Sequence, residues 1–263
     1  MITELKAHQE PAMSPAEWEA RVNLAAFYRL AAHYGWTDLI YTHISARVPG
    51  PEEHFLLNPF GWMFEEVTAS SLVKVDVHGN IASPTSHQIH PAGFVIHSAV
   101  HQARPDALCV MHSHTRAGMA VSMMDCGLLP LSQHAMLFEG RVAYHDSEGL
   151  ALDLNERARL VLDLGANAVM ILRNHGTLVV GSSMVETFSM MWHLEKAMQA
   201  QVDALASRQK LTMPPAEVRL ATAKSGFTHK KMEQYSDAQS PLGRLEWPAL
   251  LRKLNRIDPS YRS

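Results

Sequence analysis

The sequence predicts a single α/β domain followed by a C-terminal extension. Apolar runs typical of buried strands, such as 107–114 and 168–174, alternate along the chain with segments of helical periodicity. No linker-like stretch interrupts this alternation before residue 208. With 263 residues, 47% of them hydrophobic, the chain can bury a full core. We therefore expect residues 1–207 to form one domain and residues 208–263 to pack on it or on a neighbouring subunit.

The first helix is predicted by a start signal. Ser14, Pro15 and Glu17 form a capping-box sequence, with serine at the N-cap, proline next and glutamate three residues after the cap. Gly35 is expected to end this helix. Short strands, one helical turn and a chain reversal then follow: strands 43–48, 54–59 and 72–77, the helical turn 68–71, and the reversal 78–80.

The rest of the domain alternates helices with buried strands. Pro91 opens a helix that ends before Pro105, Gly165 ends a later helix, and Gly176 marks a turn. The expected strands are 107–114, 140–145, 168–174 and 177–180, and the expected helices are 92–103, 116–124, 154–165 and 184–207. Beyond residue 208 the pattern weakens, and Pro214-Pro215 and Ser240-Pro241 interrupt it.

Composition and charge exclude several classes of partner. The net charge is −3 without long runs of like charge, so we expect no binding to nucleic acid or anionic membranes. The polar N-terminus lacks the apolar core of a signal peptide, and no apolar stretch is long enough to span a bilayer. Cys109 and Cys126 both lie in apolar contexts, which argues against a disulfide. A cytoplasmic protein that acts on a small molecule fits best.

Three histidines are the candidate metal ligands. His112 and His114 lie two residues apart at the end of a predicted buried strand, so their side chains point to the same side. His175 ends another such strand and is the best third candidate, with Gly176 giving the chain freedom to turn. Three imidazoles leave one coordination position open for water or substrate, as in catalytic sites. We expect one divalent ion, zinc first, although imidazole also suits iron and manganese.

Other patterns that use paired histidines fit less well. A cupin would need an all-β chain and a glutamate where Gly118 and Met119 stand, and an amidohydrolase would place the pair on its first strand. His97 and His101 have the spacing of a zinc pair on a helix. Because Ser98 stands where the metalloprotease pattern requires glutamate, a packing or solvent-facing role is favoured for both.

Two sequence blocks carry a family resemblance. HSAVHQARPDALCVMHSHT (97–115) and MILRNHGTLVVG (170–181) together resemble the class II aldolase/adducin family, and the similarity extends from about Glu17 to Ala206. The resemblance implies a three-layer α/β/α sandwich with a mostly antiparallel central sheet. It also implies a homotetramer with active sites between subunits, and a metal ion held by the histidines at 112, 114 and 175.

The chain departs from the family at two places. The sugar-phosphate aldolases of the family carry a glutamate that moves a proton during enediolate chemistry, and Gly93 stands at that position here. Their phosphate-binding loop contains Gly-Asn before Ile/Val-Ser, where this chain has Thr42 and His43. These two residues are therefore candidates for binding a substrate without a phosphate. His90, near the absent glutamate, is a candidate acid–base residue.

Two further family positions are retained. Tyr144 resembles the tyrosine that donates a proton across the subunit interface in the aldolases, and plain packing at an interface is the alternative. Arg116, just beyond the histidine pair, could bind a substrate carboxylate through two hydrogen bonds, or it could be an ordinary surface or intersubunit arginine.

These observations favour a metal-dependent carbon–carbon lyase. Decarboxylation requires a metal ion and a later proton donor but no base, so the absence of a carboxylate at Gly93 fits it better than retro-aldol cleavage. An unphosphorylated hydroxy acid, aromatic or otherwise, is the expected substrate class. A non-haem iron oxygenase on the same histidines and a non-catalytic, adducin-like binding protein are the alternatives.

Overall fold

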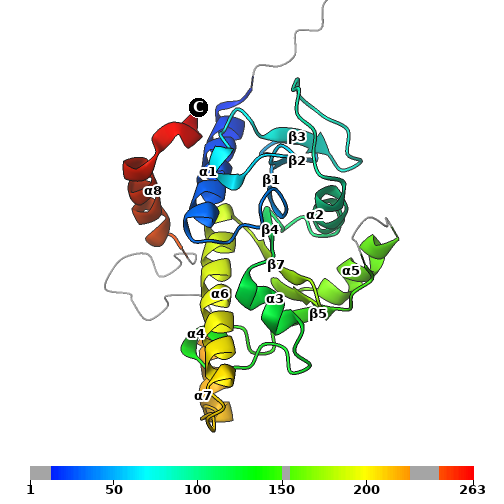
Figure 1. Ribbon diagram of the computed structural model, residues 1–263. Helices are drawn as coiled ribbons and strands as arrows, with labels where there is room; N and C mark the ends of the chain where they lie inside the picture. Colours follow the sequence, from blue (N-terminus) through cyan, green and yellow to red (C-terminus); the bar gives the residue numbers. More distant parts are fainter. Residues whose placement is uncertain (1–12, 150–154, 226–242) are drawn as a thin grey trace, which may run out of the picture.

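The computed structural model describes residues 13–149, 155–225 and 243–263. A seven-stranded sheet runs through the molecule with the spatial order β3-β2-β1-β4-β7-β6-β5 (Figure 1). Every neighbouring pair is antiparallel except β5 and β6. The strands are β1 (His43–Arg47), β2 (His54–Leu57), β3 (Val73–Asp76), β4 (Cys109–Ser113), β5 (Val142–His145), β6 (Val169–Leu172) and β7 (Gly176–Gly181).

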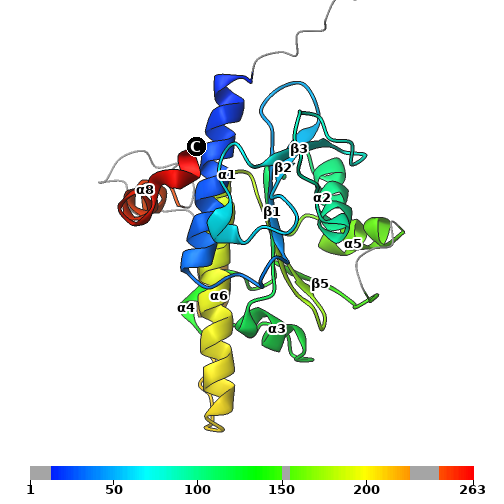
Figure 2. The ribbon, with the colours of Figure 1, turned by 45° about the horizontal axis from the view of Figure 1, so that its top comes forward.

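Helices cover both faces of this sheet. α2 and α5 pack on one face, and α1 and α6 lie on the other, with α8 outside α1 (Figure 2). The expected three-layer α/β/α sandwich with a mostly antiparallel sheet is thus confirmed. The helices are α1 (Pro15–His33), α2 (Pro91–Ala103), α3 (Arg116–Ser122), α4 (Gln133–Met136), α5 (Glu156–Leu164), α6 (Met184–Ala206), α7 (Ala216–Ser225) and α8 (Glu246–Ile257), with the 3-10 helices η1 (Phe64–Glu66) and η3 (Pro259–Arg262).

The start of α1 shows half of the predicted capping box. The Ser14 hydroxyl accepts a hydrogen bond from the Glu17 backbone N–H at 3.1 Å. The carboxylate of Glu17 does not return to the cap. It is buried and instead forms ion pairs with Arg21 at 3.0 Å and Lys74 at 2.9 Å, because buried charges require partners.

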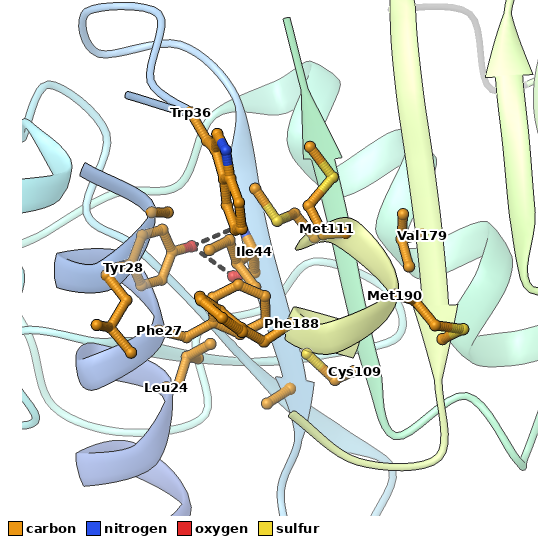
Figure 3. Packing of buried hydrophobic residues seen from close by; sticks show 14 of the residues in the cluster. Leu24, Phe27, Tyr28, Trp36, Ile44, Cys109, Met111, Val179, Phe188 and Met190 are labelled. Atoms are coloured by element: carbon orange, nitrogen blue, oxygen red, sulfur yellow. Dashed lines mark hydrogen bonds between the residues drawn. The ribbon is translucent and has the colours of Figure 1, made fainter. Parts of the chain in front are cut away.

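The largest core cluster connects α1 to β1. Tyr28 is fully buried, and its hydroxyl donates to the carbonyl of Ile44 and accepts from the Ile44 N–H at 2.8 Å (Figure 3). Phe27, beside it on α1, meets Phe188 of α6 edge to face at 5.2 Å between ring centroids. Strand β1 is therefore held in place on its apolar face, and its other face carries His43 and Ser45 towards α2.

The brief helical turn predicted at 68–71 is a single hydrogen-bonded turn, in which the Ser71 N–H donates to the Thr68 carbonyl at 3.2 Å. The Ser71 hydroxyl also donates to the Thr68 carbonyl and accepts from the Thr68 N–H, both at 2.9 Å, so these groups stabilise the turn. A 3-10 helix that was not predicted, η1, ends two residues before Thr68. Short helix α4 was not predicted either. It is a single turn capped by the Ser132 hydroxyl, too short for a periodic pattern.

The predicted C-terminal extension contains α7, α8 and η3. The indole N–H of Trp247 in α8 donates to the Asn23 side chain of α1 at 3.0 Å. Arg29 of α1 forms an ion pair with Asp258 at 2.8 Å. The end of the chain therefore packs on the body. Residues 226–242, with Ser240-Pro241, lie outside the described residues, and the division of the chain at residue 207 stays a prediction.

Within the described ranges, no helix is both long and apolar enough to cross a membrane.

Candidate metal centre

Three imidazoles converge where β4 and β7 meet. His112 is a buried residue of β4, and His114 follows directly after the strand. Their Nε2 atoms lie 2.9 Å apart. His175 joins them with ring centroids 4.7 Å from His112 and 4.8 Å from His114, and ligand atoms of all three residues lie within 4.8 Å of one another. The structure thus brings the three predicted ligands together.

The segment that carries His175 differs from its prediction. His175 does not end a strand. It lies in the tight turn between β6 and β7, where Asn174 adopts the left-handed conformation with φ +57°. Gly176 is already the first residue of β7, and a β-carbon there would lie 2.3 Å from the Ser113 carbonyl oxygen. Glycine is needed for this close approach of β7 to β4 rather than for the turn.

The hydrogen bonds of the rings determine where their lone pairs point. His112 Nδ1 lies 3.0 Å from the carbonyl oxygen of Thr177, and His114 Nδ1 lies 2.8 Å from Asp38 Oδ2. Both oxygens are acceptors, so each Nδ1 carries a proton. The two Nε2 atoms face each other at 2.9 Å, a separation at which the two rings can share one cation, either a proton or a metal ion. The donor set therefore fits a divalent metal ion.

Asp38 is a candidate residue of the metal centre that the sequence did not reveal. Its carboxylate orients His114, which is the usual arrangement around a metal-bound histidine. Asp38 lies 76 residues before His114 in the chain, in a turn closed by the Asp38–Tyr41 bridge. No local spacing connects the two residues, so only the fold shows their contact.

Burial keeps the imidazoles of His112 and His175 neutral. Removal from water lowers the pKa of His112 well below its usual value, and neighbouring histidines lower it further. Burial, assisted by His114, lowers the pKa of His175 to about 4. Neutral imidazole is the form that binds a metal ion, so these ligands remain competent well below neutral pH.

The site is open to solvent on one side. His114 and His175 are partly exposed, whereas His112 is buried. Arg116 begins α3 two residues after His114 and is exposed. Among the described residues its side chain forms no ion pair or hydrogen bond. The guanidinium predicted to bind a carboxylate is therefore available near the metal-site histidines.

The position of the family's missing glutamate is filled by another side chain. A β-carbon on Gly93 would lie 2.6 Å from Cδ2 of His43, whose ring is buried against His112 at 5.3 Å between centroids. Thr42, the preceding residue, has φ +66°, a conformation that usually requires glycine. Its buried hydroxyl has no hydrogen-bond partner among the described residues. Thr42 and His43, two of the three residues predicted to bind substrate, therefore lie where the loop meets β1.

Behind His43 lies a set of buried polar side chains that the sequence did not predict. Of the packing and solvent-facing roles expected for His97 and His101, the structure shows packing, since both are buried and hydrogen-bonded. Ser45 connects them, and His97 contacts His43 at 2.8 Å between ring nitrogens. The sequence does contain a signal for this set. His97 and His101 are four residues apart on a helix, and His43 and Ser45 are two apart on a strand, so the members of each pair share a face.

His90 and Tyr144 are the remaining predicted site residues. The His90 ring lies 6.3 Å from that of His43 and 4.6 Å from that of Phe60, and burial lowers its pKa. The Tyr144 hydroxyl accepts the Leu128 N–H at 3.1 Å, and its ring packs on the Arg173 guanidinium. Within one chain Tyr144 forms no hydrogen bond with the metal-site histidines, so its role across a subunit interface stays a prediction.

Comparisons with known proteins find relatives that match nearly the whole chain. A putative aldolase class 2 protein of Caulobacter vibrioides is 51% identical over 250 residues, which cover 95% of this chain and 94% of the relative. Alpha-adducin of Rattus norvegicus is 42% identical over 97% of this chain and 36% of its own length.

Solved structures show the same fold. An aldolase II superfamily protein from Pseudomonas syringae has a TM-score of 0.87 at 51% identity and covers 95% of this chain and 98% of its own. An L-fuculose 1-phosphate aldolase from Glaciozyma antarctica PI12 has a TM-score of 0.79 at 25% identity and covers 97% of each chain. Residues 22–202 match the class II aldolase and adducin N-terminal domain family. The chain therefore belongs to the class II aldolase and adducin family.

Proposed function

We propose that this protein is a metal-dependent carbon–carbon lyase that acts on a small, unphosphorylated hydroxy acid. The observation that carries the proposal is the pair of Nε2 atoms of His112 and His114, which face each other at 2.9 Å beside His175. Nitrogens at this separation can share a cation, and the third imidazole beside them suits a metal ion better than a proton. Zinc is the first candidate, with iron and manganese as the alternatives.

The residues of the site would divide the work as follows. An ion held by the three histidines would act as a Lewis acid towards a substrate carbonyl and an adjacent oxygen. Asp38 and the Thr177 carbonyl hold two of the rings in the tautomer that binds metal. Arg116 would bind the substrate carboxylate through paired hydrogen bonds and fix its orientation.

The loop at Thr42 and His43 supports an unphosphorylated substrate. In the family's phosphate loop a glycine allows the backbone to approach an anion, whereas here both side chains are buried in that place. Burial and neighbouring histidines lower the pKa of His43 well below its usual value, so it offers no positive charge to a phosphate. Decarboxylation or retro-aldol cleavage of a hydroxy acid, aromatic or aliphatic, remains the reaction class, with decarboxylation favoured by the missing carboxylate at Gly93.

We further propose a cytoplasmic homotetramer with active sites between subunits. In that assembly Tyr144 would donate a proton to the active site of a neighbouring subunit. The Tyr144 hydroxyl accepts from the Leu128 N–H and donates no hydrogen bond among the described residues, so its own proton is available for donation.

The first test measures bound metal and then turnover. Purified protein should carry about one divalent ion per chain, and His112→Ala and His175→Ala should each lose it while His78→Gln, an exposed control, retains it. Zinc-loaded enzyme is then offered hydroxy acids and sugar phosphates, with release of carbon dioxide and aldehyde as readouts. Metal retained in either alanine variant, or faster turnover of sugar phosphates, would overturn the proposal. Oxygen uptake by iron-loaded protein would assign the oxygenase reaction instead.

A binding protein is the second candidate function. It is favoured by the 42% identity to alpha-adducin, a match that covers 97% of this chain. A pure binding module requires no open metal site, so soluble protein that binds no zinc, iron or manganese would establish this alternative.

A further inference from the structure

A cavity separate from the metal centre lies between α6, α8 and the end of α1. Its volume is about 560 Å³, which is large enough for a small organic molecule. The three metal-site histidines do not line it, and neither does Arg116. Whatever binds there would therefore be recognised by side chains that the proposed lyase reaction does not use.

Two helices each turn one face towards this cavity. On α8 the lining residues Leu250, Lys253 and Arg256 are spaced three apart, and on α6 the lining residues Phe188 and Trp192 are four apart. Residues with these spacings lie on one side of a helix. The hydrogen bond between α8 and α1 described above holds α8 on the body, so the two faces stay opposite each other.

One wall of the cavity is aromatic. The rings of Tyr34 and Trp192 meet edge to face at 4.8 Å between centroids, and the Phe188 ring lies 6.2 Å from that of Tyr34. Phe188 is buried, whereas Tyr34 and Trp192 are partly exposed, so a ligand can reach both of these rings. Leu250 adds an aliphatic side chain from α8. Such a wall favours a flat, apolar group, because aromatic rings pack well edge to face or in offset stacks.

Positive charges accompany this aromatic wall. Nζ of Lys253 lies 4.9 Å from the ring centroid of Tyr34, and Nζ of Lys196 lies 5.3 Å from that of Trp192. Both ammonium groups are close enough to the rings for a cation–π interaction. An anionic group bound near these rings would therefore meet a favourable electrostatic potential.

Arg256 supplies a cation that is free to bind an anion. It is exposed, and within the ranges that the structure describes its guanidinium forms no ion pair or hydrogen bond. Glu246 is the acidic residue in the cavity lining. It lies in the first turn of α8, where it interacts with His193, about 15 Å along the helix from Arg256. A carboxylate beside Arg256 would therefore gain paired hydrogen bonds without close repulsion from Glu246.

We propose that this cavity is a binding site for a planar aromatic carboxylate. The ring of the ligand packs on Tyr34 and Trp192, and its carboxylate accepts hydrogen bonds from Arg256, with Lys253 as the second cation. The planar guanidinium matches the geometry of a carboxylate. A neutral ring would leave these cations without a partner, and an inorganic anion would leave the aromatic wall in water. The site goes beyond the proposed lyase function and does not depend on it.

Binding is tested with 2-naphthoate and its neutral amide, 2-naphthamide, which have nearly the same shape. Isothermal titration calorimetry of the full-length protein should show one 2-naphthoate bound per chain, and 2-naphthamide should bind about 10- to 100-fold more weakly. Arg256→Gln should remove most of this preference by weakening 2-naphthoate alone, and the fold should stay intact because the position is exposed. Trp192→Leu should weaken both ligands about 3- to 10-fold.

Two control variants separate this cavity from the metal centre. Arg252→Gln changes an exposed arginine of the same helix that does not line the cavity, and Arg116→Gln changes the arginine beside the metal-site histidines. Both variants should bind 2-naphthoate with the wild-type affinity. In ¹H–¹⁵N NMR spectra the indole N–H signal of Trp192, assigned by its loss in Trp192→Leu, should move during the titration. The signal of Trp62, which does not line the cavity, should stay in place.

Three results would overturn the proposal. Absence of saturable binding would show that the cavity is closed to ligands, for example by a neighbouring subunit. Binding that is lost in Arg116→Gln but kept in Arg256→Gln would place the ligand at the metal centre. Equal affinities for 2-naphthoate and 2-naphthamide would show that the cations around the cavity do not recognise a carboxylate.

Discussion

Asp38 Oδ2 lies 2.8 Å from Nδ1 of His114, so a carboxylate from one turn fixes the orientation of a metal-site imidazole 76 residues further along the chain. The contact joins the loop before β1 to the end of β4. It gives one of the three proposed ligands a hydrogen-bond partner, and such partners fix the orientation of the imidazoles around a metal ion.

Replacing this carboxylate should weaken metal binding without unfolding the protein. Asp38→Asn keeps an oxygen acceptor but removes the negative charge, and we expect zinc to bind about 10- to 100-fold more weakly. Competition with a chelator measures the change. Asp106→Asn is the matched control. Asp106 pairs with Arg104 just before β4 begins, at the end of the strand away from His114, so this substitution should leave the zinc affinity unaltered. Equal affinities in the two variants would remove Asp38 from the centre.

Removing the Tyr28 hydroxyl should destabilise the fold. Tyr28→Phe leaves the buried N–H and carbonyl of Ile44 without their side-chain partner, at a cost of about 1–3 kcal/mol in the free energy of unfolding. Urea denaturation measures this change. The exposed Tyr41→Phe serves as control and should stay within about 0.5 kcal/mol of wild type.

Substitutions at positions 43 and 93 should have non-additive effects on the free energy of unfolding. Gly93→Ala forces a β-carbon against the His43 ring and should cost about 1–3 kcal/mol. In a His43→Ala background the same change meets no ring, and alanine's higher helix propensity makes it neutral or stabilising. A double-mutant cycle by urea denaturation measures the coupling. Additive effects would show that the two positions do not compete for space.

Stability should fall below about pH 6.5. Burial lowers the folded-state pKa of His97 and His101, so below the unfolded value the unfolded chain binds more protons than the native one. Their contribution is therefore complete above pH 6.5 and is lost as pH falls, by about 1.4 kcal/mol per pH unit for each histidine. Denaturation of metal-free protein between pH 7.5 and 5 tests this. His78→Gln should leave the slope unchanged, and a flat profile would contradict buried neutral histidines.

Much of the fold and the metal ligands could be predicted because their signals are local. The i, i+2 spacing of His112 and His114 on a strand specifies a shared direction, and strand and helix periods mark the layers. Two features carry no such local signal. Helix α4 is too short to show a helical period, and Gly176 is needed because β7 lies close to Ser113 of the neighbouring strand β4.

The rest of the site depends on contacts between distant segments. Asp38 meets His114, and His43 meets Gly93, only after β1, β4 and α2 have packed. The sequence alone shows only that position 93 lacks a carboxylate. In the folded chain, Gly93 leaves space for the imidazole of His43.

The shared space also restricts engineering of the site. A glutamate at 93 and a histidine at 43 cannot coexist in this backbone, since even a β-carbon at 93 lies 2.6 Å from the imidazole. A designer who wishes to place a carboxylate at position 93 must therefore first replace His43 with a small residue, and the single substitution Gly93→Glu would push the imidazole away from its place beside His112.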